Sequence, residues 1–136
     1  MLFLVYIVSF LFLPERPHPE CPHIYQVDTH KKVYTQPTAW PRYPGGHDGL
    51  FRDFHQHFNY PSKQTCYPQR MVLRYTVEAN GQATDWEVFY GIEGNTKQLD
   101  SAVLEAVQHL KPFFPGTCYG TPVTVQRYLP IRVHYP

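Results

Sequence analysis

Side chains at alternate positions share a character along the C-terminal stretch, residues 120–135. One parity of that stretch carries Val123, Val125, Arg127, Leu129, Ile131, Val133 and Tyr135. A period of two with β-branched and aromatic residues predicts a strand with one buried face. Pro130 stands inside this strand, and because proline cannot donate to a ladder, the pattern favours a strand at a sheet edge. The backbone groups of such an edge either face water or pair with another chain.

Two further stretches, 70–78 and 84–91, also alternate with period two. Their expected inner faces carry Met71, Leu73, Tyr75 and Val77 on the first and Trp86, Val88 and Tyr90 on the second. Asn80-Gly81 lies between them and predicts a hairpin, since these residues accept the positive φ angles of a tight turn. Antiparallel pairing with one solvated face is therefore expected.

Two stretches have the helical period. Leu50, Phe51, Phe54 and Phe58 follow a Pro-Gly-Gly turn and predict a short helix, which Pro61 ends. The better pattern is an apolar stripe formed by Leu99, Ala102, Val103, Ala106, Val107 and Leu110. This second helix is expected to cover the inner face of the hairpin, through Leu73, Tyr75, Trp86 and Val88.

The N-terminal part has a different character. Residues 2–13 form an apolar run of 12 residues, shorter than the stretch of about 20 that crosses a bilayer. The run resembles the core of a signal peptide, although no basic residue precedes it, and it predicts export as either a cleaved leader or a shortened anchor. Residues 14–42 are rich in proline and predict an extended linker. The folded domain is then expected over residues 43–136.

Composition narrows the class of protein. A chain of 136 residues with 43% hydrophobic residues can form one domain with a core, and a formal net charge of +1 gives no nucleic-acid footprint. Cys21, Cys66 and Cys118 fit no zinc spacing. In an oxidising compartment a Cys66–Cys118 bridge is compatible with the sequence, but the odd count predicts that folding needs no bridge.

Catalytic and metal-binding motifs are not found. The chain has eight histidines, yet none stands in a His-Glu-x-x-His motif, and no Gly-x-Ser-x-Gly or phosphate-binding loop is present. His18, Cys21 and His23 are close together, but two prolines stiffen the chain between them and no second ligand pair is near. The sequence therefore predicts a protein that is not an enzyme and holds no metal or cofactor.

The order and spacing of the motifs resemble the TonB C-terminal domain family, in the form common among Bacteroidetes-type energy transducers. The resemblance covers about residues 43–136 and is carried by Tyr43-Pro44-Gly45-Gly46, Phe54, Asn59-Tyr60-Pro61, Asn80-Gly81, Leu99-Asp100 with Ala102, Phe113, Pro115-Gly116, Gly120-Thr121-Pro122-Val123 and Leu129-Pro130-Ile131. The chain departs from the family at Phe113-Phe114, where Trp-Lys is usual, and at residues 62–69, which replace a short helical segment. It also lacks the Ser-and-His anchor pattern through which such proteins engage the inner-membrane motor.

The resemblance implies an α+β fold with a three-stranded antiparallel sheet, in the order strand, strand, helix, strand, packed on a helix after a preceding short helix. It implies a periplasmic protein, held at the inner membrane, whose last strand pairs with the Ton box peptide of a TonB-dependent outer-membrane receptor. The protein would then couple proton-motive energy, through the inner-membrane motor proteins, to active transport. The partner-binding residues it implies are Val123, Thr124, Val125, Gln126, Arg127, Tyr128 and Leu129, with Tyr60 and Pro61.

Other assignments stay open. A homodimer is compatible with the sequence, and no nucleic-acid partner is expected. The alternative function is an orphan exported module that binds peptides or proteins without transducing energy, because the short apolar run suits this protein equally well.

Overall fold

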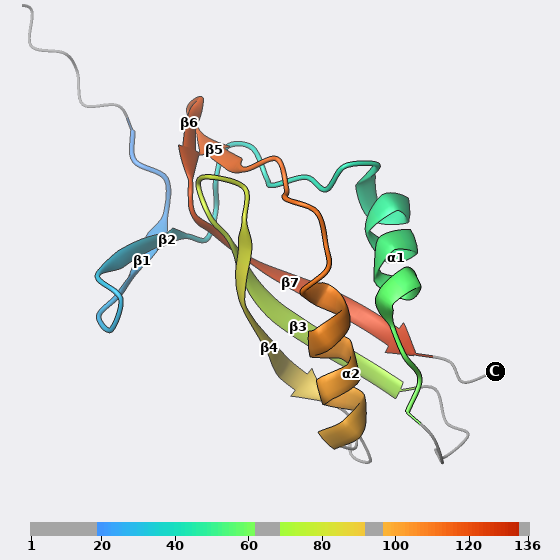
Figure 1. Cartoon of the computed structure of the whole chain (residues 1–136). Helices are drawn as coiled ribbons and strands as arrows, with labels where there is room; N and C mark the ends of the chain where they lie inside the picture. Colours follow the sequence, from blue (N-terminus) through green and yellow to red (C-terminus); the bar gives the residue numbers. More distant parts are fainter. Residues whose placement is uncertain (1–18, 62–68, 92–96, 134–136) are drawn as a thin grey trace, which may run out of the picture.

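The computed structural model describes residues 19–61, 69–91 and 97–133. Within these residues the fold is α+β, with two helices, a five-stranded mixed sheet and a separate two-stranded sheet (Figure 1). In chain order the elements are β1 (His23–Gln26), β2 (Lys31–Tyr34), α1 (Gly46–His57), β3 (Gln69–Val77), β4 (Ala83–Gly91), α2 (Lys97–Val107), β5 (Gly116–Cys118), β6 (Thr121–Val123) and β7 (Val125–Val133).

The large sheet has the strand order β1-β2-β7-β3-β4. Strands β3 and β7 form a regular antiparallel ladder from Gln69↔Val133 to Val77↔Val125, and β3 pairs with β4 on its other side. Strand β2 meets β7 in parallel at one residue pair, Tyr34↔Val125. The prediction of three antiparallel strands is thus correct for β3, β4 and β7 and wrong for the whole sheet, which has five strands of mixed direction.

The two additional strands come from the stretch predicted to be a proline-rich linker. Strands β1 and β2 pair as a hairpin, and Val33 is fully buried beneath it. Pro22 and Pro37 lie just outside these strands, so the residues between them keep the N–H groups that a ladder needs. The apolar run predicted for residues 1–13 lies outside the described residues, and within the described part of the chain no helix is long and apolar enough to span a membrane.

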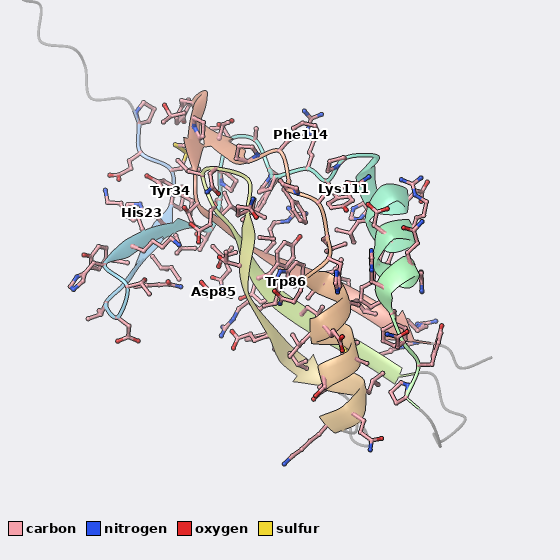
Figure 2. All side chains as sticks on the ribbon, in the orientation of Figure 1. His23, Tyr34, Asp85, Trp86, Lys111 and Phe114 are labelled. Atoms are coloured by element: carbon pink, nitrogen blue, oxygen red, sulfur yellow. A yellow bond between two sulfur atoms is a disulfide. The ribbon has the colours of Figure 1, made fainter. Side chains whose placement is uncertain are left out.

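One hydrophobic core lies between the sheet and the two helices. The predicted stripe of α2 is confirmed, because Leu99, Val103, Ala106 and Val107 are buried there with Leu73 and Tyr75 of the sheet. Trp86, labelled in Figure 2, packs against this core. Its ring stacks on that of Tyr75 with centroids 4.1 Å apart. From α1, Leu50 and Phe54 join the same cluster. Both helices therefore cover one face of the sheet, and no described helix covers the other face.

The predicted C-terminal strand is divided in two. Thr124 separates β6 from β7, and β6 turns back to pair with β5 through Tyr119 and Gly120, which both have positive φ. This small hairpin carries Cys118, which is bonded to Cys21. The bridge considered from the sequence, Cys66–Cys118, is therefore wrong, because the β1 segment brings Cys21 to within 6.1 Å of Cys118 between Cα atoms. Cys66 itself lies outside the described residues.

Candidate functional site

The outer edge of β7 is open over most of its length. On one side β7 pairs with β3 along all nine residues, whereas on the other side β2 reaches only Val125. In the described part of the chain no other strand pairs with β7. The prediction of an edge strand is therefore wrong for the sheet as a whole, because β7 lies between β2 and β3, but the outer side of β7 is open from the residue after this bridge onward.

Two observations show which backbone groups of β7 point outward. The carbonyl of Thr124, which leads into β7, accepts a hydrogen bond of 2.8 Å from the N–H of Tyr34 and so faces away from β3. Pro130, opposite Val72, has the same parity and has no N–H to offer to β3. Because the groups of an antiparallel strand alternate in direction, the N–H and C=O of Tyr128 and Arg132 also point outward, together with the C=O of Pro130.

A cavity of about 380 Å³ lies beside this open edge. One wall is β7 itself, from Arg127 to Pro130, and the opposite wall is the chain that enters α1, from Pro41 to His47. Its apolar lining comes from Leu50, Tyr75 and Phe113. The bridge Arg42↔Phe114, with hydrogen bonds of 2.7 and 3.0 Å, holds the two loops of the far wall together. The open edge and an apolar groove therefore run side by side.

Charged and aromatic side chains frame the groove. The guanidinium of Arg127 lies 4.9 Å from the ring centre of Trp40, and that of Arg42 lies 5.9 Å from the ring centre of Phe114. Burial raises the pKa of Tyr75, and a hydrogen bond with Arg127 partly offsets that effect. Neither arginine forms an ion pair with a described carboxylate. The groove thus presents cations supported on aromatic rings beside an apolar floor.

The predicted partner-binding residues play different parts in this geometry. The side chains of Val123, Val125 and Leu129 are buried, so these residues hold the strand in place and do not offer side chains to a partner. Tyr128 is 49% exposed on the open face of the sheet, where its ring contacts Phe89 at 5.1 Å between centroids.

Three more predicted residues lie around the start of β7. Thr124 donates its hydroxyl to Glu78 over 3.2 Å, so its side chain faces the β3–β4 hairpin. Gln126 and Arg127 line a second hollow with Thr35 and Trp40. Gln126, Arg127 and Tyr128 are thus the predicted residues that line this hollow beside the open edge.

Tyr60 and Pro61 lie elsewhere. They follow α1 and line a separate hollow with residues along α2, from Lys97 to Glu105. The structure therefore does not bring them to the edge of β7. Sequence reasoning missed three more residues, which no periodic signal marks. Trp40 at the second hollow and Arg42 at the groove come from the stretch predicted to be a linker, whereas His47 lines the groove from the first turn of α1.

Comparisons with known proteins give one similarity. No family model matches the chain, and no curated protein matches it. Among solved structures, the chain is similar to the NMR solution structure of the Helicobacter pylori TonB C-terminal domain, residues 179–285, at 23% sequence identity and a TM-score of 0.45. The match covers 68% of this chain and 87% of that one.

Proposed function

We propose that this chain is a TonB-like binding protein that captures an extended peptide on the open edge of β7 and performs no catalysis. The observation that carries the proposal is the row of outward backbone groups at Tyr128, Pro130 and Arg132, which lies beside an apolar groove. Addition of a strand to such an edge is an established mode of peptide capture. The motif resemblance in the sequence points to the Ton box of an outer-membrane receptor as the peptide.

Main-chain bonds alone would give weak binding. Beyond Gln126, Tyr128 and Arg132 offer two groups each and Pro130 offers one, so a partner strand over residues 128–132 can form up to five hydrogen bonds. At about 1 kcal/mol net for each bond they supply roughly 5 kcal/mol. Loss of translational and rotational freedom costs at least about 4 kcal/mol. Useful affinity therefore requires partner side chains in the groove lined by Leu50 and Phe113.

A pair of substitutions at one residue tests the docking edge. Tyr128→Pro removes an outward N–H and places a ring on the edge, whereas Tyr128→Ala removes the side chain and keeps the N–H. We expect Tyr128→Pro to weaken binding at least 10-fold relative to Tyr128→Ala. The measurement is fluorescence anisotropy with a labelled synthetic Ton box peptide from a receptor encoded in the same genome, and circular dichroism reports folding.

Arg127→Pro is the matched control for strand direction. The N–H of Arg127 faces β3 opposite Tyr75, so this substitution is expected to lower the thermal midpoint, whereas Tyr128→Pro leaves the midpoint near that of Tyr128→Ala. Equal binding by Tyr128→Pro and Tyr128→Ala would remove the edge as the docking surface. If the unmodified chain bound no such peptide, the orphan exported module would become the better proposal.

We also propose that residues 1–13 direct export and hold the chain at the inner membrane, where it couples proton-motive energy to transport. The support is the apolar run together with the motif resemblance. Fractionation of cells should then place the chain in the envelope, and receptor-dependent uptake should stop both on deletion of the gene and on addition of a protonophore. A chain recovered only from the cytoplasm would contradict this proposal.

A further inference from the structure

Strand β2 occupies the N-terminal end of the outer edge of β7, where a partner strand could otherwise pair. The N–H of Tyr34 donates to the carbonyl of Thr124, and Tyr34 is paired with Val125. Val33 beside it is 0% exposed, so the strand is fixed by a buried side chain as well. A partner strand cannot form a bond to the same carbonyl while β2 is in place.

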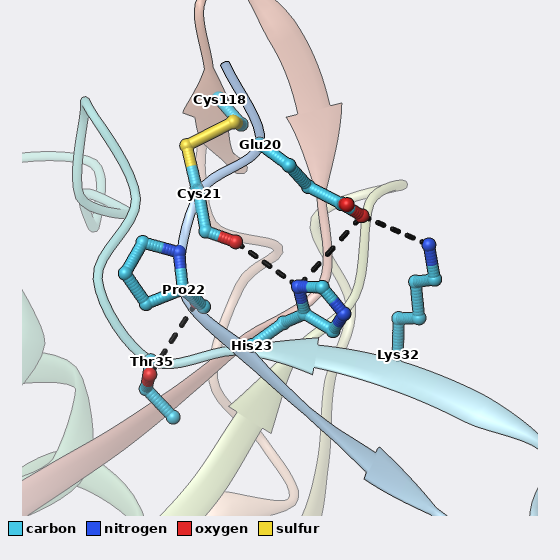
Figure 3. Close-up of polar contacts among 7 residues, drawn as sticks. All are labelled: Glu20, Cys21, Pro22, His23, Lys32, Thr35 and Cys118. Atoms are coloured by element: carbon cyan, nitrogen blue, oxygen red, sulfur yellow. Dashed lines mark hydrogen bonds and ion pairs between the residues drawn. A yellow bond between two sulfur atoms is a disulfide. The ribbon is translucent and has the colours of Figure 1, made fainter.

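The contact between β2 and β7 is short, and ties outside the ladder hold the hairpin there. Figure 3 shows the disulfide from Cys21 to Cys118, which joins the start of β1 to the β5–β6 hairpin. Close to it, Lys32 forms an ion pair of 2.9 Å with Glu20, and the hydroxyl of Thr35 donates to the carbonyl of Pro22 over 3.4 Å (Figure 3). The N–H of Thr35 donates to the same carbonyl over 3.0 Å. These contacts keep the hairpin folded beside β7.

Glu78 provides a second attachment at the other end of the hairpin. Its carboxylate accepts from Lys31 of β2, from Thr84 of β4 over 2.8 Å and from Thr124 before β7 over 3.2 Å. One largely buried carboxylate therefore joins β2 to the start of β7. Together, the Glu78 carboxylate and the disulfide hold β2 at a high effective concentration next to β7, although the two strands pair at one residue only.

We infer that the β1–β2 hairpin is a built-in cap that excludes a partner strand from the start of β7 and confines docking to residues 128–132. Past β2, the guanidinium of Arg127 lies over the ring of Trp40, 4.9 Å from its centre, so Trp40 borders β7 next to the cap. The cap thereby limits the partner to a short extended segment. This inference rests on the proposed docking function and adds a determinant of selectivity to it.

The test uses the full chain and a probe copied from the cap. The probe is a labelled peptide of residues 30–36, His-Lys-Lys-Val-Tyr-Thr-Gln, and its control is the same peptide N-methylated at the position of Tyr34. The proteins are the unmodified oxidised chain and a triple variant, Cys21→Ser, Cys118→Ser and Lys31→Ala, which loses both attachments. We expect the variant to bind the probe at least 10-fold more tightly than the unmodified chain and to discriminate against the methylated control.

Hydrogen exchange gives an independent readout. The amide of Tyr34 should exchange at least 10-fold faster in the triple variant. The amides of the β3–β4 ladder should exchange faster only by the amount that the change in the global free energy of unfolding accounts for. Should the triple variant lose cooperative folding, Lys31→Ala alone, with the disulfide intact, should accelerate the Tyr34 amide at least 3-fold.

Two results would overturn the cap. One is probe binding by the unmodified chain that equals binding by the variant, and the other is a Tyr34 amide that exchanges at the same rate in every protein. Either result leaves binding of the Ton box peptide at Tyr128 unaffected, so a failure of the cap is distinguishable from a failure of the docking function.

Discussion

Removal of the Cys21–Cys118 bridge should lower stability substantially without abolishing folding. The bridge joins residues 97 positions apart. A closed loop of about 100 residues restricts the unfolded chain by up to about 4.7 kcal/mol in the chain-entropy model, so we expect Cys21→Ser with Cys118→Ser to cost about 3 to 5 kcal/mol. At about 2.1 cal/mol/K for each of roughly 100 folded residues, this loss lowers the thermal midpoint by roughly 15 to 25 °C.

The transition should nevertheless remain cooperative. The main core is built from α1, α2, β3, β4 and β7, and neither cysteine of the bridge belongs to it. The assay is urea unfolding followed by circular dichroism, for the oxidised chain, the double variant and the oxidised chain with a thiol reductant added. Cys66→Ser keeps the bridge and is the control.

Two results would refute this reasoning in different ways. A double variant whose free energy of unfolding lies within about 1 kcal/mol of that of the oxidised chain would refute the loop-entropy estimate. It would mean that the entropy the β1–β2 hairpin gains when it is released offsets the entropy that the unfolded chain gains, since fixing one residue costs about 1 to 2 kcal/mol. A double variant with no cooperative transition would show that the bridge is required for folding, against the prediction drawn from the odd number of cysteines.

Two further predictions concern the core and the response to pH. Val103 is 0% exposed, so Val103→Asp buries an unpaired charge and should unfold the domain or lower its thermal midpoint by at least about 10 °C. Ser101→Asp, on the exposed side of the same helix, is the control and should have a thermal midpoint near that of the unmodified chain. Burial tends to raise the pKa of Glu78, but hydrogen bonds from Lys31, Thr84 and Thr124 outweigh it and hold the pKa below its ordinary value of 4.5. A lowered folded pKa stabilises the fold above about pH 4.5 and loses that contribution as the pH falls further, so urea midpoints of the unmodified chain and Glu78→Gln should converge in acid. A difference that stays constant from pH 7 to pH 3 would contradict this assignment.

The main elements of the domain were predictable because their core residues recur along the sequence with the period of a strand or of a helix. Strand β3 buries Met71, Leu73, Tyr75 and Val77, which are the alternate positions read from the sequence. Helix α2 has four buried residues from its predicted stripe. In both elements the apolar positions are numerous enough to distinguish a period of 2 from one of 3.6.

The β1–β2 hairpin could not be recognised in this way. Each of its strands has four residues, and Val33 is the one fully buried among them, while Ile24 and Tyr25 are 47% and 55% exposed. Four positions are too few to establish a period, and the prolines on both sides favour extended chain. Because the hairpin was missed, Trp40 was not placed at the second hollow, Arg42 was not placed at the groove and Cys21 was not paired with Cys118.

Besides indicating an open strand edge, Pro130 shows which backbone N–H groups of β7 face outward. A strand with a single continuous neighbour needs the N–H groups of one parity for the ladder, so a proline that leaves the ladder intact must belong to the other parity. Pro130 therefore assigns the N–H of Tyr128 and of Arg132 to the open side, and the carbonyl of Thr124, which bonds to Tyr34, agrees with this. The same proline leaves a gap in the docking edge, because a partner residue opposite it finds an acceptor but no donor. A partner strand should consequently be held most firmly at Tyr128 and Arg132, on either side of that gap, and a substitution that restores a donor at position 130 should strengthen its binding.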